Sequence, residues 1–296
     1  MPQPVVRVRA WAKVNLHLGV HTQRDAEGYH RVDSVMAAIS LADDVIVTPS
    51  DALEVSMEPA VSVEPQLNSA YRAAALMGEA LGRVPRVAIH VRKRIPMRAG
   101  LGGPSTDAAA VICALCRLWE IDVHDERVLG VARSIGADVP FFLYGPVGYL
   151  GCRGDVMEEE FEPLPPLPVV LVKPEGAGVA ALAAYQRFDE RPVKPREPDA
   201  MRSALRAGDA DAVLAHIANN LAPAACDLAP EICAALGWLR EQSGVRVAEV
   251  SGSGSCSFAV CESDERARML AVAARQQGWW SYAAHMEKTG LVPKFL

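Results

Sequence analysis

A glycine-rich stretch near residue 100 has the residue types that hold phosphate groups. From Lys93 it reads Lys-Arg-Ile-Pro-Met-Arg-Ala-Gly-Leu-Gly-Gly-Pro-Ser-Thr-Asp. Alternating apolar residues at 87–91 predict a strand before it, and an alanine-rich apolar run after it predicts a helix. Glycines let the backbone turn tightly, and the free N–H groups that start a helix favour an anion. The stretch therefore predicts a phosphate-binding loop, with Ser105 or Thr106 as the cap of the helix.

This loop differs from two common nucleotide-binding patterns. A Walker loop needs a Gly-Lys pair, and the chain contains none. The dinucleotide fingerprint needs a third glycine at the position where Ser105 stands. By itself, the loop leaves a plain tight turn as an equal alternative.

Two charged residues are candidates for the chemistry of phosphoryl transfer. Lys13 stands inside an apolar strand pattern, where a lysine is costly to bury without a partner. It either snorkels to the surface or directs a compact cation at an anionic reacting group. Asp138 stands in Gly-Ala-Asp-Val-Pro, ahead of an apolar segment that Pro140 begins. It either caps a helix there or accepts a proton.

An aromatic ring and an imidazole end a polar turn at Gly28-Tyr29-His30. The simple interpretation is that Tyr29 covers an edge of the core and that His30 is a surface histidine. The functional interpretation is a nucleobase pocket, which uses stacking and hydrogen bonds to the base edge. Later in the chain, Ser-Gly-Ser-Gly-Ser at 251–255 by itself predicts a hairpin loop.

Composition and charge narrow the class of protein. The chain has 296 residues, half of them hydrophobic and 22% charged, which predicts a folded protein with a sizeable core. A formal charge of −6 does not indicate binding to nucleic acid or to an anionic membrane. No apolar span approaches the roughly 20 residues that cross a bilayer. The N-terminus lacks a secretory pattern, and seven scattered cysteines fit a reducing compartment, so we expect a cytoplasmic protein.

The pattern along the chain predicts two domains, 1–151 and 152–296, of mixed helix and strand. The predicted strands are 5–10, 14–20, 32–42, 44–48, 87–91, 169–173, 245–250, 257–261 and 279–285. The predicted helices are 68–81, 108–119, 124–135, 176–188, 199–207, 209–222, 228–243 and 263–277. The Cys113–Cys116 pair lies within an apolar helix and is expected to pack in the core.

Taken together, the motifs resemble those of the GHMP small-molecule kinases. Lys13-Val14-Asn15, the glycine loop and Ser-Gly-Ser-Gly-Ser follow the order of that superfamily's three motifs. Stretches at 12–16, 28–30, 93–96, 136–140 and 251–254 are similar to the members that phosphorylate 4-diphosphocytidyl-2-C-methyl-D-erythritol. The resemblance spans about residues 10 to 261. It implies an α+β fold with a ribosomal-protein-S5-like first domain, a ferredoxin-like α/β sandwich as the second, and an active site between them.

The resemblance also implies a reaction and a set of site residues. ATP, accompanied by Mg²⁺, would phosphorylate the 2-hydroxyl of the cytidyl substrate, a step of non-mevalonate isoprenoid synthesis. Asp138 would be the base or would orient the hydroxyl, and Lys13 would keep that carboxylate ionised and stabilise developing charge. The implied ATP-binding residues are Asn68, Lys93, Pro96, Met97, Arg98, Ala99, Gly100, Leu101, Gly102, Gly103, Pro104, Ser105 and Thr106, with Ser105 also a candidate Mg²⁺ ligand. The implied substrate-binding residues are Asn15, Tyr29, His30, Tyr185, Gly252 and Ser253, with the two tyrosines on either face of the cytosine.

The glycine loop departs from the family pattern, which typically has glycine at Arg98 and Pro104 and often at Ala99. Pro104 removes one N–H donor, and Arg98 adds a cation. Two alternatives follow: a catalytically impaired paralogue that binds the cytidyl ligand, or a GHMP kinase for another small alcohol. The expected partner is a small molecule rather than nucleic acid or membrane, and the expected assembly is a monomer or homodimer.

Overall fold

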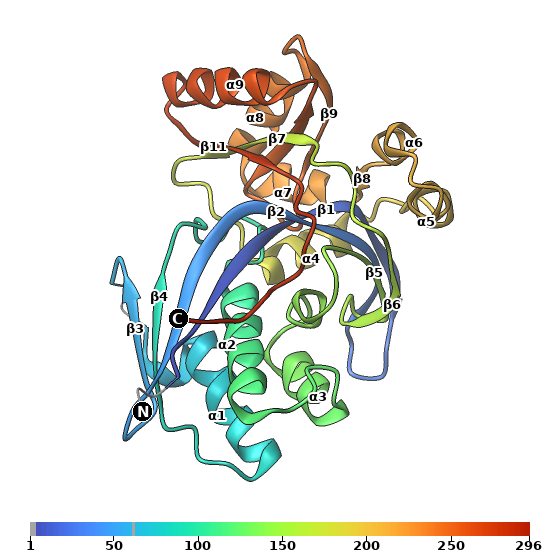
Figure 1. Cartoon of the computed structure of the whole chain (residues 1–296). Coiled ribbons are helices and arrows are strands. Elements are labelled where there is room, and N and C mark those ends of the chain that lie inside the picture. The colour runs from blue at the N-terminus through green and yellow to red at the C-terminus, as the bar shows by residue number, and fades with distance from the viewer. Residues whose placement is uncertain (1–3, 61–62) are drawn as a thin grey trace.

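A hairpin of two long strands, β1 (Val6–Arg24) and β2 (His30–Pro49), curves across the molecule next to the second sheet (Figure 1). The computed structural model describes residues 4–60 and 63–296. We predicted two separate strands in each of these segments, and that prediction was wrong. Register shifts at Trp11/Ala12 and Asn15/His17 bend the ribbon without ending it.

The first sheet is built around this hairpin. Its strand order is β12 (Lys294–Phe295), β1, β2, β4 (Val87–Arg92) and β3 (Glu54–Glu58), while β5 (Val147–Gly151) also pairs with β2, β6 (Val156–Glu160) with β5, and β8 (Ala218–Asn219) with β1. Because β6 belongs to this sheet, the sheet continues past Gly151 to Glu160. Strands from the end of the chain also join it, and the division into domains stays a prediction.

Three helices lie on one side of the first sheet (Figure 1): α1 (Ser69–Leu81), α2 (Gly103–Trp119) and α3 (Glu126–Ile135). Every residue of α2 from Thr106 to Cys116 is buried, and most of them are alanine or another apolar residue, as expected for a helix that is apolar on most sides. Cys113 and Cys116 are buried there, which confirms their core position. A 3₁₀ turn, η1 (Pro65–Leu67), precedes α1, and a second, η2 (Pro140–Leu143), follows α3.

The second sheet is a four-stranded antiparallel layer. Its order is β11 (Trp279–His285), β7 (Pro168–Pro174), β10 (Ser257–Cys261) and β9 (Val245–Val250), and α8 (Pro230–Arg240) and α9 (Asp264–Gln276) pack on it. Apolar residues of both sheets, including Leu16, Ile39, Leu171 and Phe258, form one continuous core cluster. The two layers are therefore held together by burial of apolar surface.

The segment between β7 and β9 differs from the prediction. It forms α4 (Ala181–Glu190), α5 (Asp199–Arg206), α6 (Ala210–Ala215) and α7 (Ala222–Leu228). The predicted helix at 209–222 was wrong, because the chain leaves α6 and pairs with β1 as β8. There Asn219 donates to the carbonyls of Val250 and Gly252, and Asn220 bonds both backbone groups of Val20. These hydrogen bonds between side chains and the backbone take the place of the hydrogen bonds that a helix would form here.

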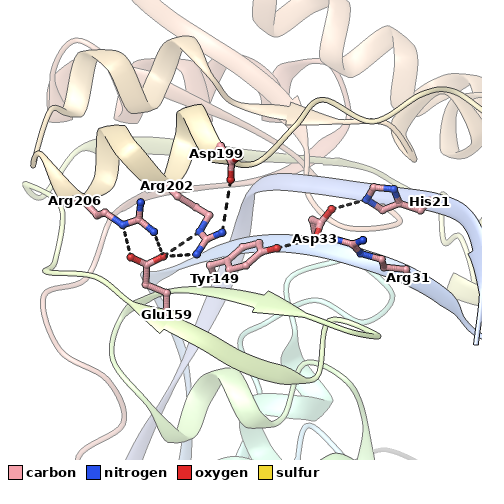
Figure 2. A network of polar contacts seen from close by, with 8 residues as sticks. All are labelled: His21, Arg31, Asp33, Tyr149, Glu159, Asp199, Arg202 and Arg206. Atoms are coloured by element: carbon pink, nitrogen blue, oxygen red, sulfur yellow. Dashed lines mark hydrogen bonds and ion pairs between the residues drawn. The ribbon is translucent and has the colours of Figure 1, made fainter.

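A polar network attaches α5 to the first sheet (Figure 2). Glu159 of β6 accepts hydrogen bonds from Arg202 and Arg206 of α5, at 3.0 and 2.5 Å. The guanidinium of Arg202 lies 4.4 Å from the centre of the Tyr149 ring, and the Tyr149 hydroxyl donates to Asp33 Oδ1 at 2.8 Å. The network thus ties α5 to β5 and β2. Within the described residues, no helix is long and apolar enough to span a membrane.

Candidate active site

Lys13 and Asp138 meet in the interior of the molecule. Lys13 Nζ lies 3.3 Å from Asp138 Oδ2, and the lysine is only 2% exposed. Lys13 therefore does not snorkel to the surface. Asp138 lies in the turn between α3 and η2, whose N-cap is Val139, so Asp138 does not cap this helix. The two residues form a buried ammonium beside a carboxylate that is one-third exposed.

The Lys13 ammonium is directed by its neighbours on the hairpin. Asn15, two residues along β1 and on the same face, accepts a hydrogen bond from Lys13 Nζ at 2.6 Å. Asn15 Nδ2 donates in turn to Ser34 Oγ on β2 at 3.0 Å. The backbone N–H of Lys13 donates to the Leu101 carbonyl, so strand β1 also positions the glycine loop. This chain of contacts orients the cation toward the N-terminus of α2.

The glycine loop presents the open N-terminus of α2. The N-cap is Gly102, in the left-handed conformation, and no side chain among the described residues caps it. The prediction that Ser105 or Thr106 caps this helix was wrong. Pro104 occupies one of the first two helical positions, where its fixed φ suits the helix and its N–H would have no helical acceptor. The first turn therefore keeps its anion-binding character.

A second loop, 251–256, clamps the glycine loop from the other sheet. Ser251 Oγ donates to the Gly100 carbonyl at 2.9 Å, and the Cys256 N–H donates to the Ala99 carbonyl at 3.1 Å. Gly100 has a φ of +71°, and a Cβ there would lie 2.0 Å from the Ser251 carbonyl oxygen. Arg98 also adopts a positive φ of 50°, which explains why glycine suits that position. Ser255 Oγ supports it by donating to the Arg98 carbonyl at 3.2 Å.

A cavity of about 310 Å³, here called the small cavity, opens at this junction. Its lining includes Lys13, Asn15, Gly100, Gly102, Ser105, Asp138, Gly252 and Ser253. Gly252 leaves the space open, because a Cβ there would lie 3.4 Å from both Lys13 Nζ and Asn15 Oδ1. The structure therefore brings together a cation, a carboxylate, a hydroxyl and the start of a helix around one space.

A larger cavity of about 730 Å³, here called the aromatic cavity, adjoins the small one. Tyr29, His30 and Tyr185 line it. The rings of His30 and Tyr185 stack with their centres 5.6 Å apart, and His30 Nδ1 lies 2.7 Å from the His21 carbonyl oxygen. His30 Nε2 lies 3.1 Å from Asp189 Oδ1, at an angle that makes no hydrogen bond. Tyr29 is 58% exposed and stands at the rim.

Tyr185 connects the two cavities. It lines both, together with Val32, Ala137 and Arg153. Burial raises the pKa of Tyr185 to about 12, and the nearby charge of Asp138 adds to this effect. Tyr185 therefore presents a neutral phenol between the aromatic cavity and the Lys13–Asp138 pair.

Several predicted residues lie outside these cavities. Asn68 caps α1 by accepting from the N–H groups of Ala70 and Tyr71. Lys93 is bound by two buried carboxylates, Asp43 and Asp107, the latter at 2.5 Å. Burial raises the pKa of Asp107 to about 7, although Lys93 opposes the shift. The roles of Asn68 and Lys93 beside an adenine stay predictions.

The remaining loop residues divide by burial. Ala99, Leu101 and Thr106 are buried, whereas Met97 and Arg98 are exposed. Gly103 packs against Ile95, and Pro96 is partly buried. For these residues, contact with ATP stays a prediction.

Sequence reasoning missed Arg153. It belongs to the turn between β5 and β6, lines both cavities, and holds its guanidinium 4.4 Å from the centre of the Tyr29 ring. The only local signal was a charged residue between Gly151 and Gly154. Ser34 and Asp189 were missed for the same reason, since their partners lie on other strands and helices.

The fold and this site define a GHMP kinase. Residues 68–146 match the family model described as GHMP kinases N terminal domain, and residues 201–278 match GHMP kinases C terminal. Solved structures at low identity share the fold, among them a homoserine kinase from Cytophaga hutchinsonii, 17% identical with a TM-score of 0.68 over 99% of this chain and 97% of that one. The chain is thus a small-molecule kinase of mixed α and β structure, as the sequence predicted.

Similarity over nearly the whole length narrows the family further. The chain is 34% identical to a 4-diphosphocytidyl-2-C-methyl-D-erythritol kinase of Desulfitobacterium hafniense, over 96% of this chain and 97% of that protein. It is 38% identical to the Thermobifida fusca protein of the same name, over 92% of each. A crystal structure of 4-(cytidine 5'-diphospho)-2C-methyl-D-erythritol kinase matches with 36% identity and a TM-score of 0.78, over 95% of this chain and 98% of that one. The chain belongs to the 4-diphosphocytidyl-2-C-methyl-D-erythritol kinase family.

Proposed function

We propose that the chain transfers the γ-phosphoryl group of ATP to the 2-hydroxyl of 4-diphosphocytidyl-2-C-methyl-D-erythritol, in the non-mevalonate route to isoprenoid precursors. The observation that carries this proposal is the Lys13–Asp138 pair, 3.3 Å apart, in a cavity that adjoins an aromatic one. The hydroxyl to be phosphorylated would lie at this pair, and the cytosine would lie among Tyr29, His30 and Tyr185. The named family supports the same assignment.

The reaction is a displacement at phosphorus. The substrate oxygen forms a bond to the γ-phosphorus, the bond to the β-γ bridging oxygen breaks, and ADP leaves. Asp138 accepts the hydroxyl proton or orients the hydroxyl, while Lys13 stabilises the negative charge that develops on the transferred group. Since phosphoryl transfer depends mainly on positioning and charge stabilisation, this pair and the open helix N-terminus supply the needed groups.

The triphosphate would lie along the glycine loop, from Pro96 to Thr106. The Gly102 N-cap and the first turn of α2 face the small cavity, and an anion is favoured there by the helix dipole. Pro104 does not argue for an inactive paralogue, because it occupies a position that suits proline. Arg98 is exposed, with its side chain against Gly178, so it does not crowd this space.

The residues around the small cavity fit a magnesium ion that accompanies ATP. Mg²⁺ in such sites keeps most of its water and takes one or two protein oxygens besides the phosphates. Ser105 and Asp138 both line the cavity, and Ser105 Oγ lies near the Gly136 turn that leads to Asp138. These residues would hold the ion or its water shell, and the ion would neutralise charge on the β- and γ-phosphates.

The test is ADP release from the purified chain with Mg-ATP, with and without the cytidyl substrate. We expect release that depends on this substrate and that is lost in Asp138→Ala. Mevalonate and homoserine serve as competing alcohols in the same assay. Faster turnover of either one, or no turnover of any alcohol, would contradict the proposal.

A further inference from the structure

Among the described residues, those that line both cavities include only one charged residue. Val32, Ala137, Arg153 and Tyr185 line both spaces. A ligand with its base in the aromatic cavity and its hydroxyl at Lys13 and Asp138 would cross the boundary that these four residues share. Val32 and Ala137 carry no charge, and the phenol of Tyr185 stays neutral. Arg153 is therefore the one charged residue of the four.

The backbone of Arg153 is firmly attached to the first sheet. The flanking Cys152 carbonyl accepts from the Val32 N–H at 2.8 Å, and Val32 and Arg153 form a parallel bridge. The Arg153 N–H donates to Asp155 Oδ1 at 3.2 Å, which closes the turn between β5 and β6. The origin of this side chain is therefore fixed relative to both cavities.

The guanidinium, in contrast, has partners that are easily exchanged. It bonds Asp25 and Glu27, the latter at 2.5 Å, and both carboxylates belong to the tip of the β1–β2 hairpin. Their side chains are 34% and 63% exposed. Exposed ion pairs of this kind contribute little to stability, because water and salt screen them. The same guanidinium covers a face of the Tyr29 ring.

We propose that Arg153 exchanges these carboxylates for the diphosphate of the cytidyl substrate and so selects diphosphate-linked alcohols. This inference rests on the proposed function. A guanidinium fork can bind two phosphate oxygens at once, and the diphosphate carries its two negative charges in a single group. The exchange also uncovers the face of Tyr29 that Arg153 occupies, which then becomes free to stack on the cytosine. Arg153 thus couples recognition of the diphosphate to that of the base.

The test compares the binding of CDP and of cytidine to the full-length chain by titration calorimetry. We expect Arg153→Met to weaken CDP binding by about 10- to 100-fold, the range for a lost charge-assisted contact, while cytidine binding changes by no more than a few fold. Arg153→Lys should retain part of the preference for CDP. Equal weakening of both ligands would show that Arg153 only holds the hairpin tip, and would overturn the proposal.

Arg24→Met is the matched control. Arg24 also bonds exposed groups, the Gly28 carbonyl at the hairpin tip and Asp189 of α4, and it lines the aromatic cavity but not the small one. Its replacement should leave the ratio of CDP to cytidine affinity unchanged, and a ratio that falls as in Arg153→Met would overturn the assignment. Thermal unfolding of each variant shows whether the fold is retained.

Glu27→Gln tests the exchange in the opposite direction. Because Glu27 competes for the guanidinium, its neutralisation should tighten CDP binding about two- to fivefold. Unchanged or weaker binding contradicts the exchange. The assay of ADP release separates this inference from the proposed function. If the wild type turns over the cytidyl substrate but prefers CDP no more than cytidine, only the role of Arg153 is wrong. If it binds CDP through Arg153 without any turnover, only the proposed function is wrong.

Discussion

The two adjoining cavities are built in opposite ways. The small cavity is built around a buried cation, Lys13, which is only 2% exposed, and the glycine loop beside it is clamped by hydrogen bonds from loop 251–256. The aromatic cavity ends at the tip of the β1–β2 hairpin, where Tyr29 is 58% exposed. This tip is held by ion pairs between Arg153 and two neighbours of Tyr29, Asp25 and Glu27.

This difference separates reaction from recognition. Transfer of a phosphoryl group requires groups fixed to within a fraction of an ångström, and dense packing with backbone hydrogen bonds provides that rigidity. Recognition of a substrate that must enter and leave benefits from side chains that exchange partners at little cost. Changes in the small cavity should therefore reduce the rate or the stability, whereas changes at the aromatic cavity should reduce affinity.

Replacing Lys13 should have the largest effect. Lys13→Met removes the cation beside Asp138 and leaves Asn15 Oδ1 without its donor. We expect kcat to fall about 10²- to 10³-fold, as for the loss of one electrostatic contact to the transition state, with a smaller change in KM. Steady-state kinetics measure both constants, and Lys173→Met, on β7, is the control. A loss confined to KM would show that Lys13 serves binding rather than transfer.

The clamp on the glycine loop is tested by a pair of alanine substitutions. Gly100 and Gly82 both have positive φ, at +71° and +64°, but a Cβ meets the Ser251 carbonyl at Gly100 and nothing within 4 Å at Gly82. Gly82→Ala should lower the free energy of unfolding by about 1 kcal/mol, because it adds only the backbone strain of a positive φ. Gly100→Ala should cost at least about twice as much and should also raise KM for ATP. Urea unfolding and kinetics provide the measurements, and equal costs would mean that the clamp does not restrain the loop.

Tyr29→Ala probes the aromatic cavity. Loss of a stacking ring should weaken binding of the base by about 1–3 kcal/mol, which corresponds to a rise in KM for the cytidyl substrate of about 5- to 150-fold. The value of kcat should change little, because Tyr29 does not line the small cavity. Tyr282→Ala, a partly exposed tyrosine on β11, is the control. A fall in kcat without a rise in KM would show that Tyr29 serves phosphoryl transfer rather than binding of the base, and would contradict this prediction.

The smallest expected effect concerns the hairpin that both cavities share. Burial lowers the pKa of His17, on β1, to about 4, and Arg196 and His21 add to this while Asp33 opposes it. The unfolded chain takes up a proton near pH 6.5 and the folded chain only near 4, so acid favours unfolding between these values. Between pH 7 and 5.5 this group should cost about 1 kcal/mol of stability.

Urea unfolding at several pH values measures this dependence. His17→Gln should have a flatter stability profile between pH 7 and 5.5, even if its stability at pH 7 is lower. His285→Gln, at an exposed position of β11, should keep the slope of the wild type. A His17→Gln profile as steep as that of the wild type would assign the acid sensitivity to other groups.

The site motifs could be predicted from the sequence because each is local. The glycine loop between a strand and a helix, Lys13 and Asn15 two residues apart on one strand, and Asp138 in Gly-Ala-Asp-Val-Pro all specify backbone and chemistry within a few residues. Alternation and helical periodicity likewise predicted α1, α9, β9 and β10 closely, because amphipathic patterns are local too. Within α2, by contrast, the helix cap was misassigned, since Gly102 rather than a hydroxyl begins it.

Only the tertiary structure decided which distant residues meet. Arg153 reaches Tyr29 across more than a hundred residues. Asn219 bonds the carbonyls of Val250 and Gly252 where a helix was predicted, and Lys93 is bound by Asp43 and Asp107. Such pairs depend on how the two sheets pack along the β1–β2 hairpin, and no local pattern encodes a partner on another strand. The sequence by itself therefore determined the reacting groups and the phosphate loop, while packing decided the passage between the cavities, because long-range contacts follow from the burial of whole faces.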